Sequence, residues 1–141
     1  MQIDIKSIVI LLLLAALIAL LIRLSKKSKI KQTRYKSDSG DMVKSRAELV
    51  IANWLFYHGV EFLYEKRADA SQRVISDFYL IKYDVYIEFW GLETPVYLKR
   101  KKKKVKIYKK NRLKLIQMND DSLRDLNKFF AKEFAKFGIK H

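Results

Sequence analysis

The chain has 141 residues, which is enough for one domain with a core of ordinary size and an appended segment. It contains no cysteine, which excludes disulfides and thiolate metal sites, and its histidines, His58 and His141, are too few for a histidine-rich zinc site. Thirty Lys and Arg residues against fifteen Asp and Glu residues give a net charge of +15. That charge indicates a polyanionic partner, either nucleic acid or an anionic membrane surface.

The first predicted element is an apolar helix. The run Ile8–Ile22 contains only Ile, Val, Leu and Ala. Extended to Ile3 and Leu24, it gives a helix of about 33 Å at about 1.5 Å per residue, which matches a bilayer core of about 30 Å. A cleaved signal peptide is the alternative, but little positive charge precedes the run and no small-residue cleavage site follows it. We therefore expect residues 1–24 to form an uncleaved transmembrane anchor.

Basic residues flank this anchor unevenly. Lys6 alone precedes it and is offset by Asp4, whereas seven basic residues follow between Arg23 and Lys36. The positive-inside rule therefore predicts a single-pass protein whose C-terminal part lies in the cytoplasm. Residues 25–42 are rich in Lys and Ser, and we expect a flexible basic linker that contacts anionic membrane lipids.

The segment from residue 43 to residue 141 predicts one α/β domain. Ser45-Arg46-Ala47-Glu48 is a capping box that begins a helix, and Gly59 closes that helix. The stretch Val74–Gly91 is rich in β-branched and aromatic residues and predicts two strands joined by a tight turn near Lys82-Tyr83. The other expected elements are strands at Val60–Lys66 and Leu113–Met118, a helix at Tyr97–Arg112 and a last helix after Asp120. This order predicts a mixed sheet flanked by helices.

The two central strands are expected to hold two carboxylates face to face. Because side chains alternate between faces, Phe78 and Ile87 point into the core, and Asp77 and Glu88 share the opposite face. With a two-residue turn, Asp77 lies directly across from Glu88, where like charges repel unless a cation is present. A divalent metal between them is one resolution, and solvation or pairing with lysines is the other. Glu48 on the first helix is either a cap residue or a further carboxylate of this site.

The predicted helix Tyr97–Arg112 carries a charge run of one sign. It holds ten basic residues, and no acidic residue lies between Glu93 and Asp120. Such a block repels itself and is stabilised when phosphates neutralise it. A solvated surface is the alternative, and a clamp for anionic lipid is another.

The order of elements and these residues resemble the PD-(D/E)XK nuclease superfamily, in particular its small endonuclease-like members fused or related to helicase and mismatch-repair enzymes. The resemblance covers Val43–Met118 and rests on Ser76-Asp77-Phe78, on Ile87-Glu88-Phe89-Trp90-Gly91 and on Glu48. It implies a restriction-endonuclease-like core of a helix, a three-strand meander, a helix and a strand, with a C-terminal helix added. It also implies that Asp77, Glu88 and Glu48 bind Mg²⁺, with Mn²⁺ as a substitute.

The chain departs from the superfamily pattern at two positions. Ser76 stands where a proline usually precedes the aspartate, and Trp90 stands where a lysine is expected after the acidic residue of the third strand. Some branches supply that lysine from the second helix instead, which makes Lys104 the candidate, with Lys101 as a substitute. If neither reaches the site, the domain binds nucleic acid without cutting it.

The resemblance and the charge together predict a membrane-anchored, metal-dependent endonuclease that hydrolyses DNA phosphodiester bonds at the cytoplasmic face. The expected catalytic residues are Asp77, Glu88, Lys104 and Glu48. The expected nucleic-acid-binding residues are Arg100, Lys101, Lys102, Lys103, Lys106 and Tyr108. The alternative is a catalytically inactive nuclease-like domain that tethers nucleic acid to the membrane.

Overall fold

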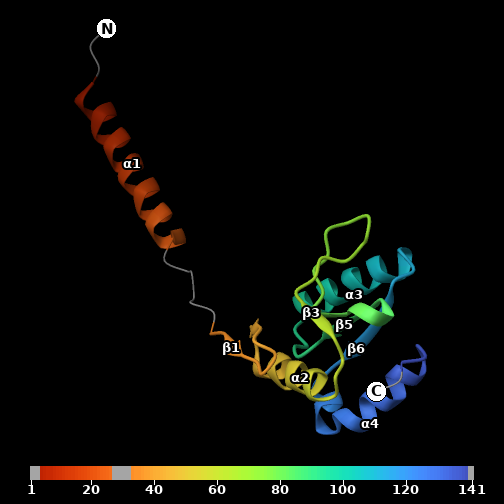
Figure 1. Ribbon diagram of the computed structural model, residues 1–141. Coiled ribbons are helices and arrows are strands. Elements are labelled where there is room, and N and C mark those ends of the chain that lie inside the picture. Colours follow the sequence, from red (N-terminus) through yellow and green to blue (C-terminus); the bar gives the residue numbers. More distant parts are fainter. Residues whose placement is uncertain (1–3, 27–32, 140–141) are drawn as a thin grey trace. The chain divides into compact units, whose positions relative to one another are not determined.

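A computed structural model describes residues 4–26 and 33–139 and divides the chain into two units, Met1–Gln32 and Thr33–His141 (Figure 1). Within the first unit, α1 (Ile5–Lys26) is a single apolar helix. Its stretch Ile5–Arg23 is long and apolar enough to cross a membrane, and none of that stretch is buried. Residues 1–3 of the expected anchor and residues 27–32 of the expected linker lie outside the described residues.

The second unit begins with a small hairpin inside the segment expected to be a flexible linker. Strand β1 (Tyr35–Lys36) pairs antiparallel with β2 (Met42–Val43). The turn is tied to the next helix, because the Asp38 backbone N–H donates to Asn53 Oδ1 at 2.9 Å and the Tyr57 hydroxyl donates to Asp38 Oδ2 at 2.8 Å. The folded unit therefore begins at Thr33 rather than at Val43, which corrects the predicted boundary.

Helix α2 (Arg46–Tyr57) begins and ends close to where the sequence predicts. Ser45 is its N-cap, with the side chain accepting from the Glu48 N–H at 3.1 Å. Gly59 follows the helix with a φ of +66°, a left-handed conformation that favours glycine. The residues of α2 that are buried, Ile51, Ala52 and Leu55, lie on one face of the helix.

The sheet contains β3 (Phe62–Tyr64), β4 (Phe78–Leu80), β5 (Val85–Phe89) and β6 (Lys114–Met118), in that spatial order. The first three strands form an antiparallel meander, and β6 runs parallel to β5. Helix α3 (Pro95–Lys110) connects those two parallel strands, as a parallel pair requires a crossover. The predicted α/β class with a mixed sheet is confirmed.

The turn between β4 and β5 differs from the prediction, although the pairing is the expected one. A short 3-10 helix, η1 (Ile81–Tyr83), makes the connection, and Asp84 follows it with a φ of +53°. The register nevertheless pairs Phe78 with Ile87 and Leu80 with Val85. The predicted two-residue turn and the observed connection are both centred on the peptide bond between Lys82 and Tyr83, so both pair the same residues of β4 and β5. Continuing the register by one residue places Asp77 opposite Glu88.

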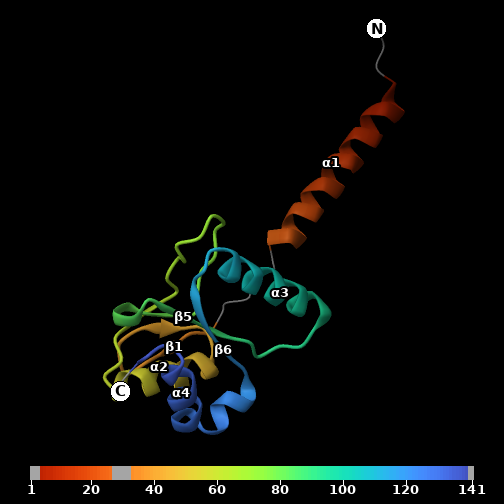
Figure 2. The ribbon, with the colours of Figure 1, turned by 90° about the vertical axis from the view of Figure 1, so that its right-hand side faces the viewer.

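The sheet lies between α3 on one face and α2 with α4 (Leu126–Ala135) on the other (Figure 2). The main core fills the second face and contains Phe78 and Ile87 from the sheet. A smaller cluster on the α3 face contains Tyr86 from β5 and Tyr108 from α3. Glu88, two residues after Tyr86 on the same strand, therefore also faces α3.

The expected last helix is broken in two. A 3-10 segment, η2 (Asp120–Arg124), is capped by Asn119, and α4 begins only after Asp125. Asp125 has an extended φ of −150°, and its side chain accepts from the Lys128 N–H at 2.9 Å. An aspartate at this position caps a new helix instead of continuing the first one.

Candidate active site

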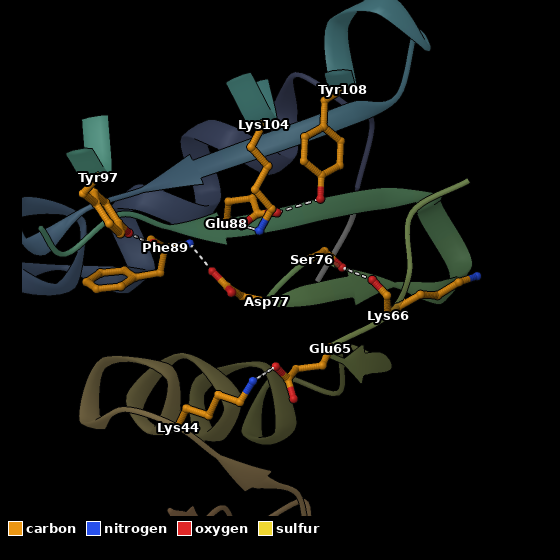
Figure 3. A network of polar contacts seen from close by, with 10 residues as sticks. All are labelled: Lys44, Glu65, Lys66, Ser76, Asp77, Glu88, Phe89, Tyr97, Lys104 and Tyr108. Atoms are coloured by element: carbon orange, nitrogen blue, oxygen red, sulfur yellow. Dashed lines mark hydrogen bonds and ion pairs between the residues drawn. The ribbon is translucent and has the colours of Figure 1, made fainter. Parts of the chain in front are cut away.

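Glu88 forms the centre of a buried polar cluster on the α3 face of the sheet (Figure 3). Its side chain is only 1% exposed. Lys104 Nζ lies 2.6 Å from Oε2, and the Tyr108 hydroxyl donates to Oε1 at 2.6 Å. Lys104 and Tyr108 stand one turn apart on α3, so both side chains reach the same carboxylate. Each oxygen of this buried acid thus has a donor.

Asp77 lies immediately before β4 and reaches across to the neighbouring strand. Its Oδ2 accepts a hydrogen bond from the Phe89 N–H at 2.7 Å, as Figure 3 shows. Burial raises the pKa of Asp77, while the Phe89 N–H and the charge of Lys104 oppose that shift. The structure therefore holds an acidic side chain beside Glu88 in a poorly solvated position.

The two carboxylates act on each other. Burial and, after it, the charge of Asp77 raise the pKa of Glu88 to about 7, although Lys104 and Tyr108 stabilise the ionised form. When both acids are ionised, Lys104 is the only cation paired with them in the part of the chain that the structure describes. The pair therefore carries an excess negative charge that a divalent cation could neutralise.

Ser76, which replaces the expected proline, supports the position of Asp77. It is fully buried, and both its N–H and its hydroxyl donate to the Lys66 carbonyl, at 2.9 Å and 3.0 Å. A proline has no N–H and could not make the first of these bonds. Two hydrogen bonds to one carbonyl therefore fix the backbone just before Asp77.

Glu48 is held at the start of α2 by different partners. Its Oε2 accepts from the Lys44 N–H at 2.9 Å and from the Tyr64 hydroxyl at 2.5 Å. It thus caps the backbone at Lys44 rather than at Ser45, a variation on the predicted capping box. Its charge also contributes to the raised pKa of Asp77, so it acts on the site electrostatically.

The arrangement fits a metal held by two carboxylates better than one held by three. Among residues 4–26 and 33–139, no three His, Cys, Asp or Glu side chains lie close enough together to hold a metal ion. Direct ligation by Glu48 together with Asp77 and Glu88 is therefore not supported. Mg²⁺ commonly uses one or two carboxylates and completes its shell with waters and substrate phosphates, which the Asp77–Glu88 pair can accommodate.

Sequence reasoning missed a second acid beside Asp77. Glu65 follows β3 with a φ of +53°, forms an ion pair with Lys44, and donates its backbone N–H to the Asp77 carbonyl at 3.0 Å. Its charge also raises the pKa of Asp77. The signal was present in the sequence, because pairing Tyr64 with Phe78 puts the residue that follows β3 opposite Asp77. The left-handed turn and the partner Lys44 were not readable from the pattern.

Trp90 fills the position at which the superfamily pattern expects a lysine. Its ring is 9% exposed, and the Nζ atoms of Lys101 and Lys104 lie 5.4 Å and 5.7 Å from the ring centroid. These distances place both ammonium groups within cation–π range. The tryptophan therefore contacts two lysines of α3, and one of them, Lys104, also pairs with Glu88.

The basic residues of α3 divide by exposure. Arg100, Lys102, Lys103 and Lys106 are exposed, and Lys101 is half-buried. Tyr108 is only 1% exposed, and its hydroxyl is bonded to Glu88. Because it has almost no accessible surface, we remove Tyr108 from the predicted nucleic-acid-binding residues.

A search against protein-family models, a search of curated proteins and a search of solved structures each found no match. The site is therefore interpreted from its own geometry.

Proposed function

We propose that this chain is a membrane-anchored endonuclease that hydrolyses DNA phosphodiester bonds with Mg²⁺, or with Mn²⁺ as a substitute. The proposal rests on one observation above all: Asp77, the residue before β4, accepts from the Phe89 N–H of β5 beside Glu88, and Lys104 lies 2.6 Å from Glu88. The proposal includes a restriction-endonuclease-like core, which the helix–meander–helix–strand order supports.

The energetics favour a functional reason for this cluster. A buried ion pair with an additional acid beside it is often no more stable than apolar residues of the same volume. Tyr86, on the same face two residues before Glu88, packs with Tyr79 and Tyr108 and shows that apolar burial is possible there. Titratable groups with shifted pKa values that cluster against folding stability are typical of functional sites.

Each residue has a role in the proposed reaction. Asp77 and Glu88 would hold the Mg²⁺, which when bound polarises a phosphoryl oxygen and lowers the pKa of water. Lys104 would stabilise the negative charge that develops on the phosphate, in place of the lysine missing at Trp90. Glu48 and Glu65 add negative potential around Asp77, which strengthens attraction for the cation.

The anchor and its orientation form the second part of the proposal. The apolar stretch Ile5–Arg23 of α1 supports insertion in a membrane. The basic residues that follow it support a cytoplasmic position for the second unit, where DNA is present, and contacts with anionic lipid headgroups.

A specific observation favours the tether as a second candidate. Lys104 and Tyr108 together satisfy both oxygens of Glu88, so the acid is neutralised and hydrogen-bonded by the protein alone. A Glu88 whose two oxygens are already engaged by the protein is compatible with a domain that binds nucleic acid but no longer cuts it.

Cleavage by the purified full-length chain in detergent separates the two candidates. We expect Mg²⁺ or Mn²⁺ to support cutting of plasmid or single-stranded DNA, and EDTA to abolish it. Lys104→Ala should reduce cutting far more than DNA binding. Folded parent protein that binds DNA and cuts no substrate with either metal would leave only the tether.

A further inference from the structure

A basic groove runs beside Lys104, between α3 and the connection from β3 to β4. It has a volume of about 440 Å³. The connection contributes Arg73 and the apolar residues Val74 and Ile75 to its lining, and α3 contributes Arg100, Lys103, Lys104 and the apolar Ile107. No acidic residue lines it.

The wall that carries Arg73 is fixed in place by the fold. The Ala68 N–H donates to the Val74 carbonyl at 2.8 Å, closing the connection on itself, and both side chains are buried. The Ser71 N–H donates to Asn111 Oδ1 at 3.1 Å, which joins the connection to the end of α3. Arg73 is thus held opposite the basic face of α3 by a braced segment.

Among the cations that line the groove, three make no ion pair with the described residues. Of its four cations, Lys104 alone makes an ion pair among the described residues, and its partner is Glu88. Four cations along one groove repel each other, and a ligand with repeated negative charges relieves that repulsion. Lys104 therefore belongs both to the groove, beside three cations that make no ion pair among the described residues, and to the polar cluster around Glu88.

We infer that this groove binds the sugar–phosphate backbone of one nucleic-acid strand and directs it to Asp77 and Glu88, with Arg73 as a binding residue. This inference rests on the proposed function. The phosphates would lie along Arg73, Arg100 and Lys103, and the sugars would contact the apolar side chains of the lining, such as Ile75 and Ile107. Such contacts position a strand without reading its sequence.

The inference divides the basic run of α3 into two faces with different roles. A separate groove on the other face of α3 is lined by Lys102, Lys106 and Lys109 around Leu98 and Val105. Arg100, Lys103 and Lys104 are absent from its lining. Net charge alone predicts equal importance for the two faces, whereas the groove predicts that the Arg73 face dominates.

Two triple variants of the full-length protein in detergent test this division at equal charge. The first is Arg73→Gln with Arg100→Gln and Lys103→Gln, and the matched control is Lys102→Gln with Lys106→Gln and Lys109→Gln. Binding is measured in EDTA, so that the result does not depend on cleavage, with duplex and single-stranded DNA. For three lost phosphate contacts, the slope of log affinity against log salt should flatten by about 2 to 3, and by less than about 1 in the control. Equal losses in both variants would overturn the groove and leave only a net-charge effect.

Position-specific crosslinking gives a second readout that does not depend on the stability of a triple variant. Because the chain has no cysteine, Arg73→Cys and Lys106→Cys each introduce a single thiol. DNA carrying a thiol-reactive group on its backbone should crosslink to the first and poorly to the second. Crosslinking at Lys106→Cys alone would place the strand on the other face and refute the inference.

The outcomes separate this inference from the proposed function. Specific crosslinking at position 73 without any metal-dependent cutting would support the groove as a DNA-binding site and refute the proposed nuclease activity. DNA cutting that is unchanged in the Arg73 triple variant would support the nuclease activity and refute the role of the groove in binding the substrate. If anionic phospholipid micelles abolish the crosslink at position 73 and unlabelled DNA does not, the groove binds lipid instead.

Discussion

The repulsion between Asp77 and Glu88 predicts how the stability of the metal-free protein depends on pH. Folding raises the pKa of Glu88 from an ordinary value of 4.5 to about 7. A carboxyl whose pKa is higher in the folded state stabilises the fold fully below the unfolded value and loses that contribution as pH rises through the folded value. Since Asp77 is shifted in the same direction, we expect the free energy of unfolding in EDTA to fall between about pH 5 and pH 8.

The size of this fall follows from the shift of Glu88, whose side chain is only 1% exposed. The shift from 4.5 to about 7 corresponds to roughly 3 kcal/mol, at about 1.4 kcal/mol for each pKa unit. Glu88→Gln should remove this contribution. Asp77→Asn should remove only the part of the Glu88 shift that the charge of Asp77 causes, because the amide oxygen can still accept from the Phe89 N–H.

Urea titrations followed by tryptophan fluorescence provide the measurement. The two tryptophans, Trp54 and Trp90, both lie in the second unit, so their signal reports its unfolding and not that of α1. Mg²⁺ should restore stability more at pH 8 than at pH 5, because a cation needs ionised ligands. A pH profile that is the same in Glu88→Gln and in the parent would refute this reasoning.

Three further predictions concern the elements around the site. Tyr108→Phe keeps the buried ring but removes the donor to Glu88 Oε1, and should lower the free energy of unfolding by about 1.5–3 kcal/mol in denaturant titrations; an unchanged value would mean that water replaces the hydroxyl. A protein that starts at Thr33 should have a higher melting temperature than one that starts at Val43, because only the longer one keeps the hydrogen bonds of Asp38 with Asn53 and Tyr57. Equal melting temperatures would show that residues 33–42 do not stabilise the domain. The full-length chain should remain in membranes after a high-salt or carbonate wash, and its recovery in the wash would show that α1 is not an anchor.

Much of the site was predictable because it depends on strand alternation and helix spacing. Asp77 and Glu88 were placed on one face and opposite each other, even though the turn is longer than expected, since a turn centred on the same bond preserves the register. Lys104 was the candidate that the resemblance implied on the second helix, and the structure places its Nζ 2.6 Å from Glu88. The placement of the two carboxylates follows from strand alternation.

The features that sequence reasoning missed depend on tertiary contacts. The β1–β2 hairpin contains few apolar residues, and it is held by side-chain hydrogen bonds and by burial of Val43. Glu65 was assigned to the first strand; the register of β3 on β4 brings it beside Asp77, but its left-handed backbone and its ion pair with Lys44 were not readable from the pattern. Arg73 stands in a polar connection whose position opposite α3 depends on Asn111, far along the chain.

The most direct test of the central claim compares metal-dependent nicking of supercoiled plasmid by the parent and by variants of the three acids. The account predicts that Asp77→Asn and Glu88→Gln lose nicking with both Mg²⁺ and Mn²⁺ while they still bind DNA. Glu48→Gln, whose carboxylate is engaged by Lys44 and Tyr64, should keep part of it. Undiminished nicking by Asp77→Asn or by Glu88→Gln would contradict the assignment of the metal to this pair.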